Sequence, residues 1–133
     1  MKAVKILAIL FGVYVAIVVI FESLLGYYQP ANEDTLVIVT TSPEGVSNPR
    51  VVTPIDVDGT LYVAANHWPR AWYRHALANP EVQATFRGET GDYLAVSVQG
   101  EAHDRVDATR PLPMFFRILT GFPPRYFVRL DPV

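Results

Sequence analysis

The amino-terminal segment constrains this chain most, because it holds a long apolar run bounded by charges. Lys2 and Lys5 precede an uncharged stretch of 16 residues, Ile6 to Phe21, and Glu22 follows it. With the Lys5 stem reaching outward, a helix from Val4 to Leu25 is long enough to cross the ~30 Å hydrocarbon core of a bilayer. Aromatic residues suited to the interface come next, at Tyr27 and Tyr28. The pattern predicts a transmembrane anchor over residues 1–28.

Two other structures share this pattern. A cleavable signal peptide also has a basic start and an apolar middle, but after Phe21 the chain offers only Gln29-Pro30-Ala31 as a small-residue cleavage site, with proline beside the bond. A buried core helix requires apolar neighbours on all sides along nearly the whole stretch from Ala3 to Phe21. The anchor is the favoured interpretation, and the other two remain alternatives.

Charges near the span predict its orientation. Lys2 and Lys5 lie before it, whereas Glu22, Glu33 and Asp34 lie after it, and no basic residue follows until position 50. The positive-inside rule then places the N-terminus in the cytoplasm and the remaining domain outside.

Composition limits the classes of function. The 133 residues suffice for one domain plus an appendage. Eleven Lys and Arg stand against 13 Asp and Glu, for a net charge of −2, so no broad basic surface exists to attract nucleic acid. The chain has no cysteine, which excludes disulfides, thiolate catalysis and cysteine-ligated metals.

The rest of the chain reads mainly as strands after a polar linker at 29–34. Asp58-Gly59 is a type I′ hairpin signal, because both central residues of that turn need positive φ. Pro69 can begin a helix that Asn79-Pro80 stops. The expected strands are 35–41, 50–57, 60–65, 81–88, 92–104 and 125–130; the expected helices are 69–78 and 111–122, and a turn at 88–92 joins the fourth and fifth strands.

Six short, mainly antiparallel strands with two helices outside suggest a small closed barrel, since closure removes exposed edges. The fold class is therefore α+β, mainly β, with the barrel domain at 35–133. An open α+β sandwich is the structural alternative.

Common catalytic and metal motifs are absent. His67 and His75 are too far apart along the chain for a metal-binding pair, and His103 lies in a segment expected to alternate faces, so no metal site is predicted. No serine stands in a nucleophile elbow, and no glycine-rich phosphate motif occurs. Catalytic side chains stay unassigned.

The helix at 69–78 is the best candidate for ligand binding. Arg70 and Arg74 share one face, and the helix start follows a strand directly, so its amide groups can meet an anion with Trp72 as an apolar wall. Arg50 begins a neighbouring strand and can face the same barrel end. In the alternative interpretation, Trp72 packs on the barrel and the arginines are only solvated.

The segment from Thr40 to Glu89, with AWYRHALANPEV inside it, and the closing RYFVRLDPV resemble the deazaflavin-dependent nitroreductase family of split β-barrel oxidoreductases. The resemblance covers roughly 35–133 and implies a flavin or deazaflavin held beside the barrel, FMN included, which passes a hydride to a quinone-like or nitroaromatic acceptor. It implies the following cofactor-binding residues: Arg50, Thr53, Asn66, His67, Arg70, Trp72 and Arg74.

The chain departs from that family where a phosphate would bind. Members usually carry a Gly-Arg-Lys-Ser-Gly segment, and here Pro43-Glu44-Gly45-Val46-Ser47 replaces it, with an acid in place of a base. The alternative function is therefore a non-catalytic split-barrel module that binds a lipid, haem or a protein partner.

An apolar segment near the C-terminus adds a further expectation. PMFFRILTGFPP carries more apolar surface than one helix face buries, and split-barrel relatives commonly dimerise. This segment fits a homodimer contact, a membrane contact or a contact beneath the anchor.

Overall fold

The computed structural model describes residues 1–28, 34–65 and 71–133, with side chains from 26 to 28 left out. The chain divides into two compact units. One consists of the amino-terminal helix and the segment Leu112–Pro124, and the other contains all the strands of the described part of the chain.

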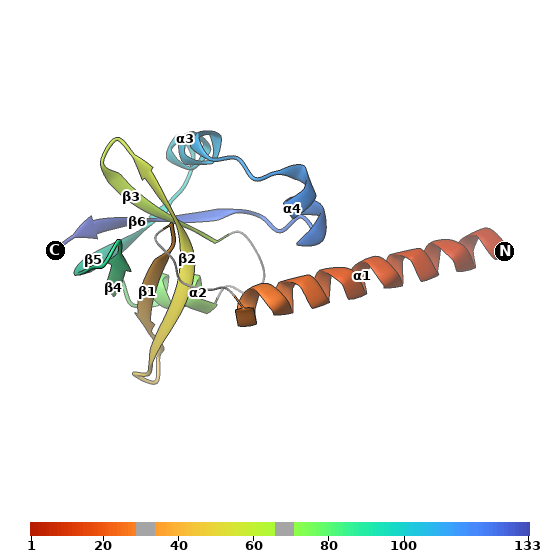
Figure 1. The fold of residues 1–133 in the computed structure, drawn as a ribbon, viewed down its shortest axis with the longest axis horizontal. Helices are drawn as coiled ribbons and strands as arrows, with labels where there is room; N and C mark the ends of the chain where they lie inside the picture. Colours follow the sequence, from red (N-terminus) through yellow and green to blue (C-terminus); the bar gives the residue numbers. More distant parts are fainter. Residues whose placement is uncertain (29–33, 66–70) are drawn as a thin grey trace. The chain divides into compact units, whose positions relative to one another are not determined.

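The strands form a closed antiparallel barrel in the order β1-β2-β3-β6-β5-β4, with β4 pairing back onto β1 (Figure 1). Their bounds are β1 Leu36–Thr41, β2 Ser47–Val57, β3 Thr60–Ala65, β4 Glu81–Phe86, β5 Glu89–Val98 and β6 Tyr126–Pro132. The predicted fold class is confirmed, and closure of the sheet rules out the open sandwich.

The hairpin between β2 and β3 turns where the sequence predicts. Asp58 and Gly59 have φ of 52° and 84°, as a type I′ turn requires. The Gly59 amide also donates to the Asp56 carboxylate at 2.9 Å, which supports the turn.

The hairpin between β4 and β5 turns earlier than predicted. Arg87 and Gly88 are its central residues, with φ of 52° and 79°, so the predicted turn at 88–92 is wrong. Gly91 instead lies within β5, where a Cβ would meet the Tyr93 ring at 3.2 Å. The adjacent aromatic ring covers the glycine and lets the strand continue through it.

The strand predicted as far as residue 104 is also wrong at its end. Gly100 has a φ of 65°, which breaks the strand, and helix α3 follows over Glu101–Thr109. Glu101 and Asp104 lie in its first turn, where carboxylates favour the positive end of the helix dipole.

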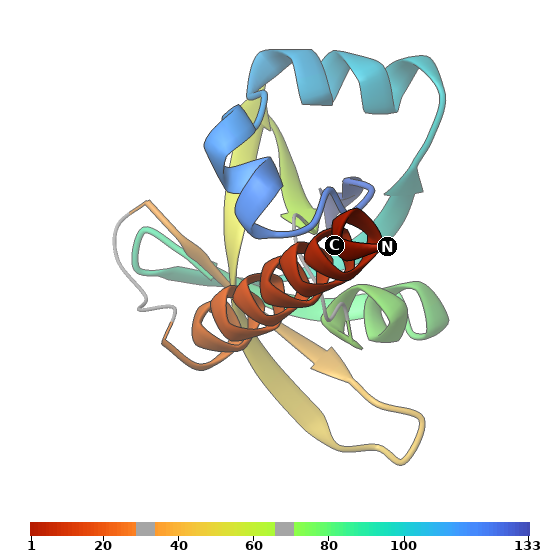
Figure 2. The ribbon, with the colours of Figure 1, turned by 90° about the vertical axis from the view of Figure 1, so that its right-hand side faces the viewer.

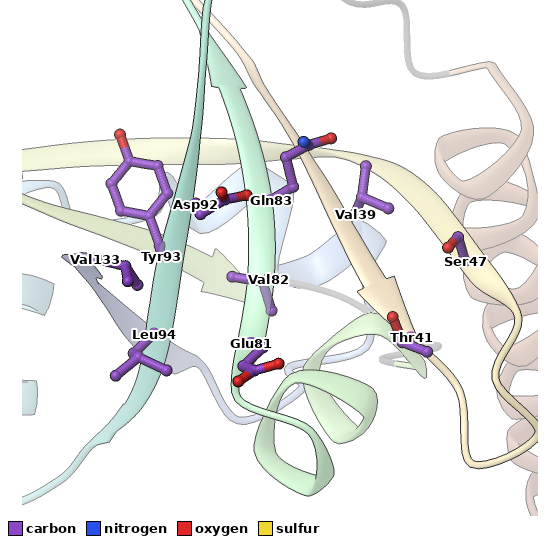
Figure 3. A pocket seen from close by; sticks show the side chains of 10 residues that line it. All are labelled: Val39, Thr41, Ser47, Glu81, Val82, Gln83, Asp92, Tyr93, Leu94 and Val133. Carbon is purple, nitrogen blue, oxygen red and sulfur yellow. The ribbon is translucent and has the colours of Figure 1, made fainter.

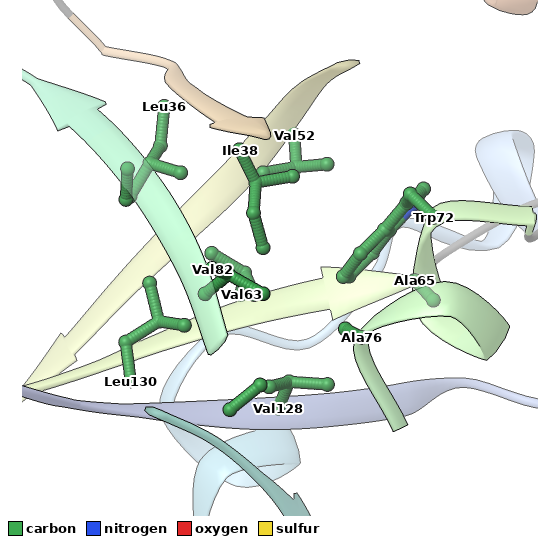
Figure 4. Packing of buried hydrophobic residues seen from close by; sticks show 12 residues of the cluster. Leu36, Ile38, Val52, Val63, Ala65, Trp72, Ala76, Val82, Val128 and Leu130 are labelled. Atoms are coloured by element: carbon green, nitrogen blue, oxygen red, sulfur yellow. The ribbon is translucent and has the colours of Figure 1, made fainter. Parts of the chain in front are cut away.

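Two apolar cores lie on opposite sides of the barrel wall. The inner core contains residues from every strand and is closed by Trp72 and Ala76 of α2, Ala71–Ala78 (Figure 4). The outer core lies under α3 and contains Ile55, Ala64, Val98, Val106 and Phe127. Side chains therefore alternate between two buried faces along much of β2, β3 and β6.

Arg125 and His103 attach α3 to β6. Arg125 donates to Asp107 at 2.8 Å and lies 4.8 Å above the Phe127 ring. His103 Nε2 is 2.7 Å from the Arg125 carbonyl oxygen. Burial lowers the pKa of Arg125, and the Asp107 carboxylate opposes that shift.

The first unit joins helix α1, Lys2–Tyr28, to the short helix α4, Met114–Leu119, which is shorter than the predicted 111–122. Within α1, Lys2–Leu25 contains an 18-residue stretch with a mean hydropathy of 2.8 and is long and apolar enough to cross a membrane, although a signal sequence has the same properties. α4 packs alongside α1 through the pair Phe21 and Phe116, whose rings meet edge to face at 5.9 Å (Figure 2).

We predict that Ile38→Ala destabilises the barrel strongly, because the side chain is fully buried in the inner core. The free energy of unfolding should fall by about 2–5 kcal/mol, as is usual for such truncations. Urea denaturation of the full chain in detergent micelles measures it. The control Val46→Ala removes an exposed side chain (56%) and should change little; equal losses in the two variants would contradict the assigned core.

Candidate functional site

The candidate site lies where α2 covers one end of the barrel. Opposed residues in an antiparallel pair share a face, so Arg50 opposite Ile38, and Asn48 opposite Thr40, lie on the inner face of the β1–β2 hairpin. Ile38 and Thr40 are fully buried there. α2 packs against β1, so the inner face of the hairpin and α2 together bound this end.

Aromatic contacts fix α2 in place. Trp72 is only 7% exposed and belongs to the inner core. Its ring meets Tyr73 edge to face at 6.0 Å, and Tyr73 stacks on Tyr126 at 5.2 Å. Trp72 therefore closes the barrel and has little surface left for a ligand, whereas Arg74 is exposed on the same helix.

The structure places two of the cofactor-binding residues implied by the resemblance, Arg50 and Thr53, on opposite faces of β2. Arg50 lies on the inner face of β2, but Thr53 lies an odd number of positions away and points to the outer face. Thr53 is opposite Ala64, which belongs to the outer core. Arg50, Trp72 and Arg74 thus lie at the α2 end without Thr53. Three predicted site residues fall outside the described part of the chain: Asn66, His67 and Arg70.

The loop at 42–46 does not fit a phosphate group. The Gly45 amide donates to the Ser42 carbonyl at 2.9 Å, the Ser42 amide to the Val46 carbonyl at 2.9 Å, and the Val46 amide to Ser42 Oγ at 3.2 Å. Pro43 has no amide hydrogen, and Glu44 is an exposed acid. The loop therefore has few donors to offer an anion, and any cationic contact must come from the arginines of β2 and α2.

A buried hydroxyl at this end was not predicted from the sequence. Thr40 Oγ1 is fully enclosed and has no hydrogen-bond partner in the described part of the chain, and the same holds for His75 Nδ1 on α2. Leaving such a group unpaired costs about 1–3 kcal/mol, so these atoms indicate where a water or ligand atom can bind. Thr40 was missed because it lies in a β-branched run that reads simply as strand.

A separate pocket of about 580 Å³ lies on the outer face of β1, β4 and β5, and includes the start of β2 and Val133 (Figure 3). Its lining residues are Val39, Thr41, Ser47, Glu81, Val82, Gln83, Asp92, Tyr93, Leu94 and Val133. None of the predicted cofactor-binding residues lines it. Glu81 and Asp92 are its charged residues, which makes it unsuited to a phosphate or another anion.

A third carboxylate lies beside this pocket. Asp131 is opposite Leu94 in the β5–β6 pair, and Arg129 donates to it at 2.7 and 2.9 Å. This hydrogen-bonded pair lowers the pKa of Asp131 and raises that of Arg129. No group of three or more metal-ligating side chains occurs among residues 1–28, 34–65 and 71–133.

Comparisons with known proteins place the fold. No family model matches the sequence. No curated protein matches it. Several solved structures are similar, however. One, described as a domain-swapped dimer, is 16% identical with a TM-score of 0.61, over 76% of this chain and 82% of the other.

Two further structures carry functional descriptions. An F420-H2-dependent reductase is 15% identical with a TM-score of 0.58, over 76% of this chain and 96% of its own. HutZ, the haem storage protein from Vibrio cholerae, is 18% identical with a TM-score of 0.58, over 85% of each chain. The resemblance to the deazaflavin-dependent reductases is confirmed at the level of the fold.

We predict that Arg129→Gln raises the pKa of Asp131 toward its ordinary value of 3.8. Pairing with Arg129 lowers the pKa of Asp131 in the folded state, so the pair stabilises the protein when the pH is above the pKa of Asp131 in the unfolded state. This stabilisation is lost as the pH falls through the pKa of Asp131 in the folded state. The side chains are 41% exposed, so the loss at neutral pH should be only about 0.2–1 kcal/mol. Carboxyl NMR titration measures the shift, with Arg105→Gln on α3 as the control that should leave Asp131 unchanged.

Proposed function

We propose that this chain is a membrane-anchored split-barrel oxidoreductase, which uses a reduced flavin or deazaflavin to transfer a hydride to a quinone-like or nitroaromatic acceptor. The observation that carries the proposal is the closed barrel with α2 across one end, a fold that extends over 96% of an F420-H2-dependent reductase. The helix at Lys2–Leu25 supports the membrane anchoring in this proposal. A lipid-soluble quinone dissolves in the same bilayer that this helix would cross.

The cofactor site in this proposal is the α2 end of the barrel. Arg50 and Arg74 supply positive charge for a phosphate in place of the 42–46 loop, with Asn66, His67 and Arg70 as further contacts expected from the sequence. The Thr40 hydroxyl offers one unused polar atom on the inner face of the hairpin. The cofactor supplies the hydride when bound, and the protein's part is to bind it, orient it and exclude water.

The membrane arrangement is part of the same proposal. Residues 1–28 are the anchor, 29–34 the linker and 35–133 the barrel domain. The charges beside the span favour a cytoplasmic N-terminus with the domain outside, and this orientation distinguishes the two candidates below. The domain-swapped dimer among the similar structures supports a homodimer of this chain as well.

We predict that the full chain in detergent micelles binds a deazaflavin or FMN, and that Arg70→Ala combined with Arg74→Ala weakens this binding at least about tenfold, because each charge-assisted contact contributes about 1.5–3 kcal/mol. Fluorescence titration with a deazaflavin, FMN and haem measures it. The matched control combines Arg87→Ala and Arg105→Ala, which removes two exposed arginines outside the α2 end.

Two results would count against the oxidoreductase. Binding of neither flavin at tens of micromolar would rule it out, and unchanged flavin affinity in the Arg70 and Arg74 variant would remove α2 from the site. Binding of haem alone would favour the second candidate.

The second candidate is a non-catalytic module that binds haem, a lipid or a protein partner. The internally hydrogen-bonded 42–46 loop with its exposed Glu44 favours it, because a phosphate-bearing cofactor finds few donors there. The similar fold of a haem storage protein supports it too.

We predict that a reporter fused to the C-terminus, active only outside the cytoplasm, is active in cells. The reason is that both basic residues near the span, Lys2 and Lys5, precede it. Activity would favour the binding module, since a deazaflavin is normally available in the cytoplasm. An inactive reporter, together with activity of a cytoplasmic reporter at the same position, would contradict the predicted orientation and favour the oxidoreductase.

A further inference from the structure

One face of α1 is covered by the segment Leu112–Pro124 within the first unit. Tyr14 Oη donates to the Ile118 carbonyl at 2.8 Å, and the Phe21 ring meets Phe116. A Cβ on Gly121 would lie 3.1 Å from Val18 Cγ1, so glycine allows this close approach. Positions 14, 18 and 21 form one stripe of a helix, and the contact therefore runs along the helix axis.

The position of this stripe along α1 determines its depth. At 1.5 Å per residue, Tyr14 lies roughly 16 Å along the helix from Leu25, about half of a ~30 Å hydrocarbon core. The part of α1 before Tyr14 would be only about 18 Å long, too short to span a bilayer alone. If α1 crosses the membrane over Lys2–Leu25, the segment that contacts Tyr14 and Val18 lies inside the membrane with it.

The outer surface of the segment suits lipid. Four of its large apolar side chains are exposed: Phe115 is 73% exposed, Met114 59%, Phe122 52% and Ile118 43%. Arg117 is the single charged residue between 112 and 124. Its long stem can carry the guanidinium toward the headgroups, as arginines near a membrane surface do.

A bilayer interior requires that polar groups are paired within the protein, and the backbone past the end of α4 meets this requirement at its amides. Past the end of α4, the Gly121 amide donates to the Ile118 carbonyl and the Phe122 amide to the Arg117 carbonyl, a Schellman motif. Thr120 is fully buried, and its hydroxyl donates to the Phe116 carbonyl at 2.9 Å. Prolines at 111, 113, 123 and 124 have no amide hydrogen to satisfy.

The contacts along α1 indicate that the segment enters the membrane and returns through the same membrane surface. Phe116 contacts Phe21, nearer the end of the span, whereas Ile118 contacts Tyr14 at mid-depth, and Gly121 contacts Val18 between them. The start of α4, whose first amides lack helical partners, is therefore nearer the headgroups, where water and phosphates can pair with them.

We propose that residues 112–124 form a re-entrant segment that inserts beside the C-terminal half of α1 and binds lipid acyl chains through Met114, Phe115 and Phe122. The inference rests on the membrane anchoring in the proposed function, and it assigns a second lipid-contacting element to the chain. The side chain of Tyr14 gains a role as well, because it pairs with a carbonyl at a depth where water is absent.

The test uses the absence of cysteine, since each variant of the full chain then has one thiol. An environment-sensitive fluorophore is attached to Phe115→Cys, and the protein is reconstituted in vesicles of phosphatidylcholine and phosphatidylglycerol with or without doxyl-labelled acyl chains. Ile20→Cys on α1, 60% exposed, is the control within the span, and Val46→Cys, 56% exposed, is the control on the barrel loop.

We expect the label at Phe115→Cys to be quenched by doxyl lipids about as strongly as the label at Ile20→Cys, with the label at Val46→Cys unquenched. Quenching at position 20 but not at 115 would overturn the re-entrant segment and leave the anchor intact. A blue-shifted but unquenched label at 115 would mean that protein covers the segment, as in a homodimer, and would overturn lipid contact. No quenching at position 20 would refute the anchor, and the re-entrant segment with it.

Discussion

Closure of the barrel is the constraint on which the other features of the second unit depend. Because β4 pairs back onto β1, every strand has two neighbours and the side chains separate strictly into an inner and an outer set. The inner set makes a core that needs a cover at its end, which Trp72 and Ala76 provide. The outer set becomes a second core only where α3 covers it, and elsewhere it lines an acidic pocket.

The same separation explains why the binding chemistry is divided over the surface. Positive charge lies at the α2 end through Arg50 and Arg74, whereas Glu81 and Asp92 lie on the outer face. An anionic ligand is therefore favoured at one place and disfavoured at the other by charge alone. The 42–46 loop connects β1 to β2, and its internal hydrogen bonds and exposed Glu44 leave it few donors for an anion.

Turn residues predicted the hairpins correctly where one turn signal was present, and incorrectly where two glycines close together could each mark the turn. Asp58-Gly59 forms the turn that the sequence predicts. Gly91 was predicted in a turn but lies in a strand, where the Tyr93 ring covers it. The opposite faces of Arg50 and Thr53 follow from strand parity and were predictable from the sequence. The presence of Glu81 and Asp92 in one pocket was not, because it depends on the β4–β5 register, which the misplaced turn shifted. Pairing between α1 and α4 joins residues more than ninety positions apart, beyond any local pattern.

The place of β6 in the barrel has a consequence for the timing of folding. This strand is made last of the six, yet it lies between β3 and β5 and supplies the fully buried Phe127 and Val128. The barrel cannot close while the ribosome is still synthesising the earlier strands, so the nascent domain stays open after α1 has emerged. An open chain is what a translocation channel can pass. If the domain is exported, it folds on the far side of the membrane, and a ligand enclosed by α2 is acquired there.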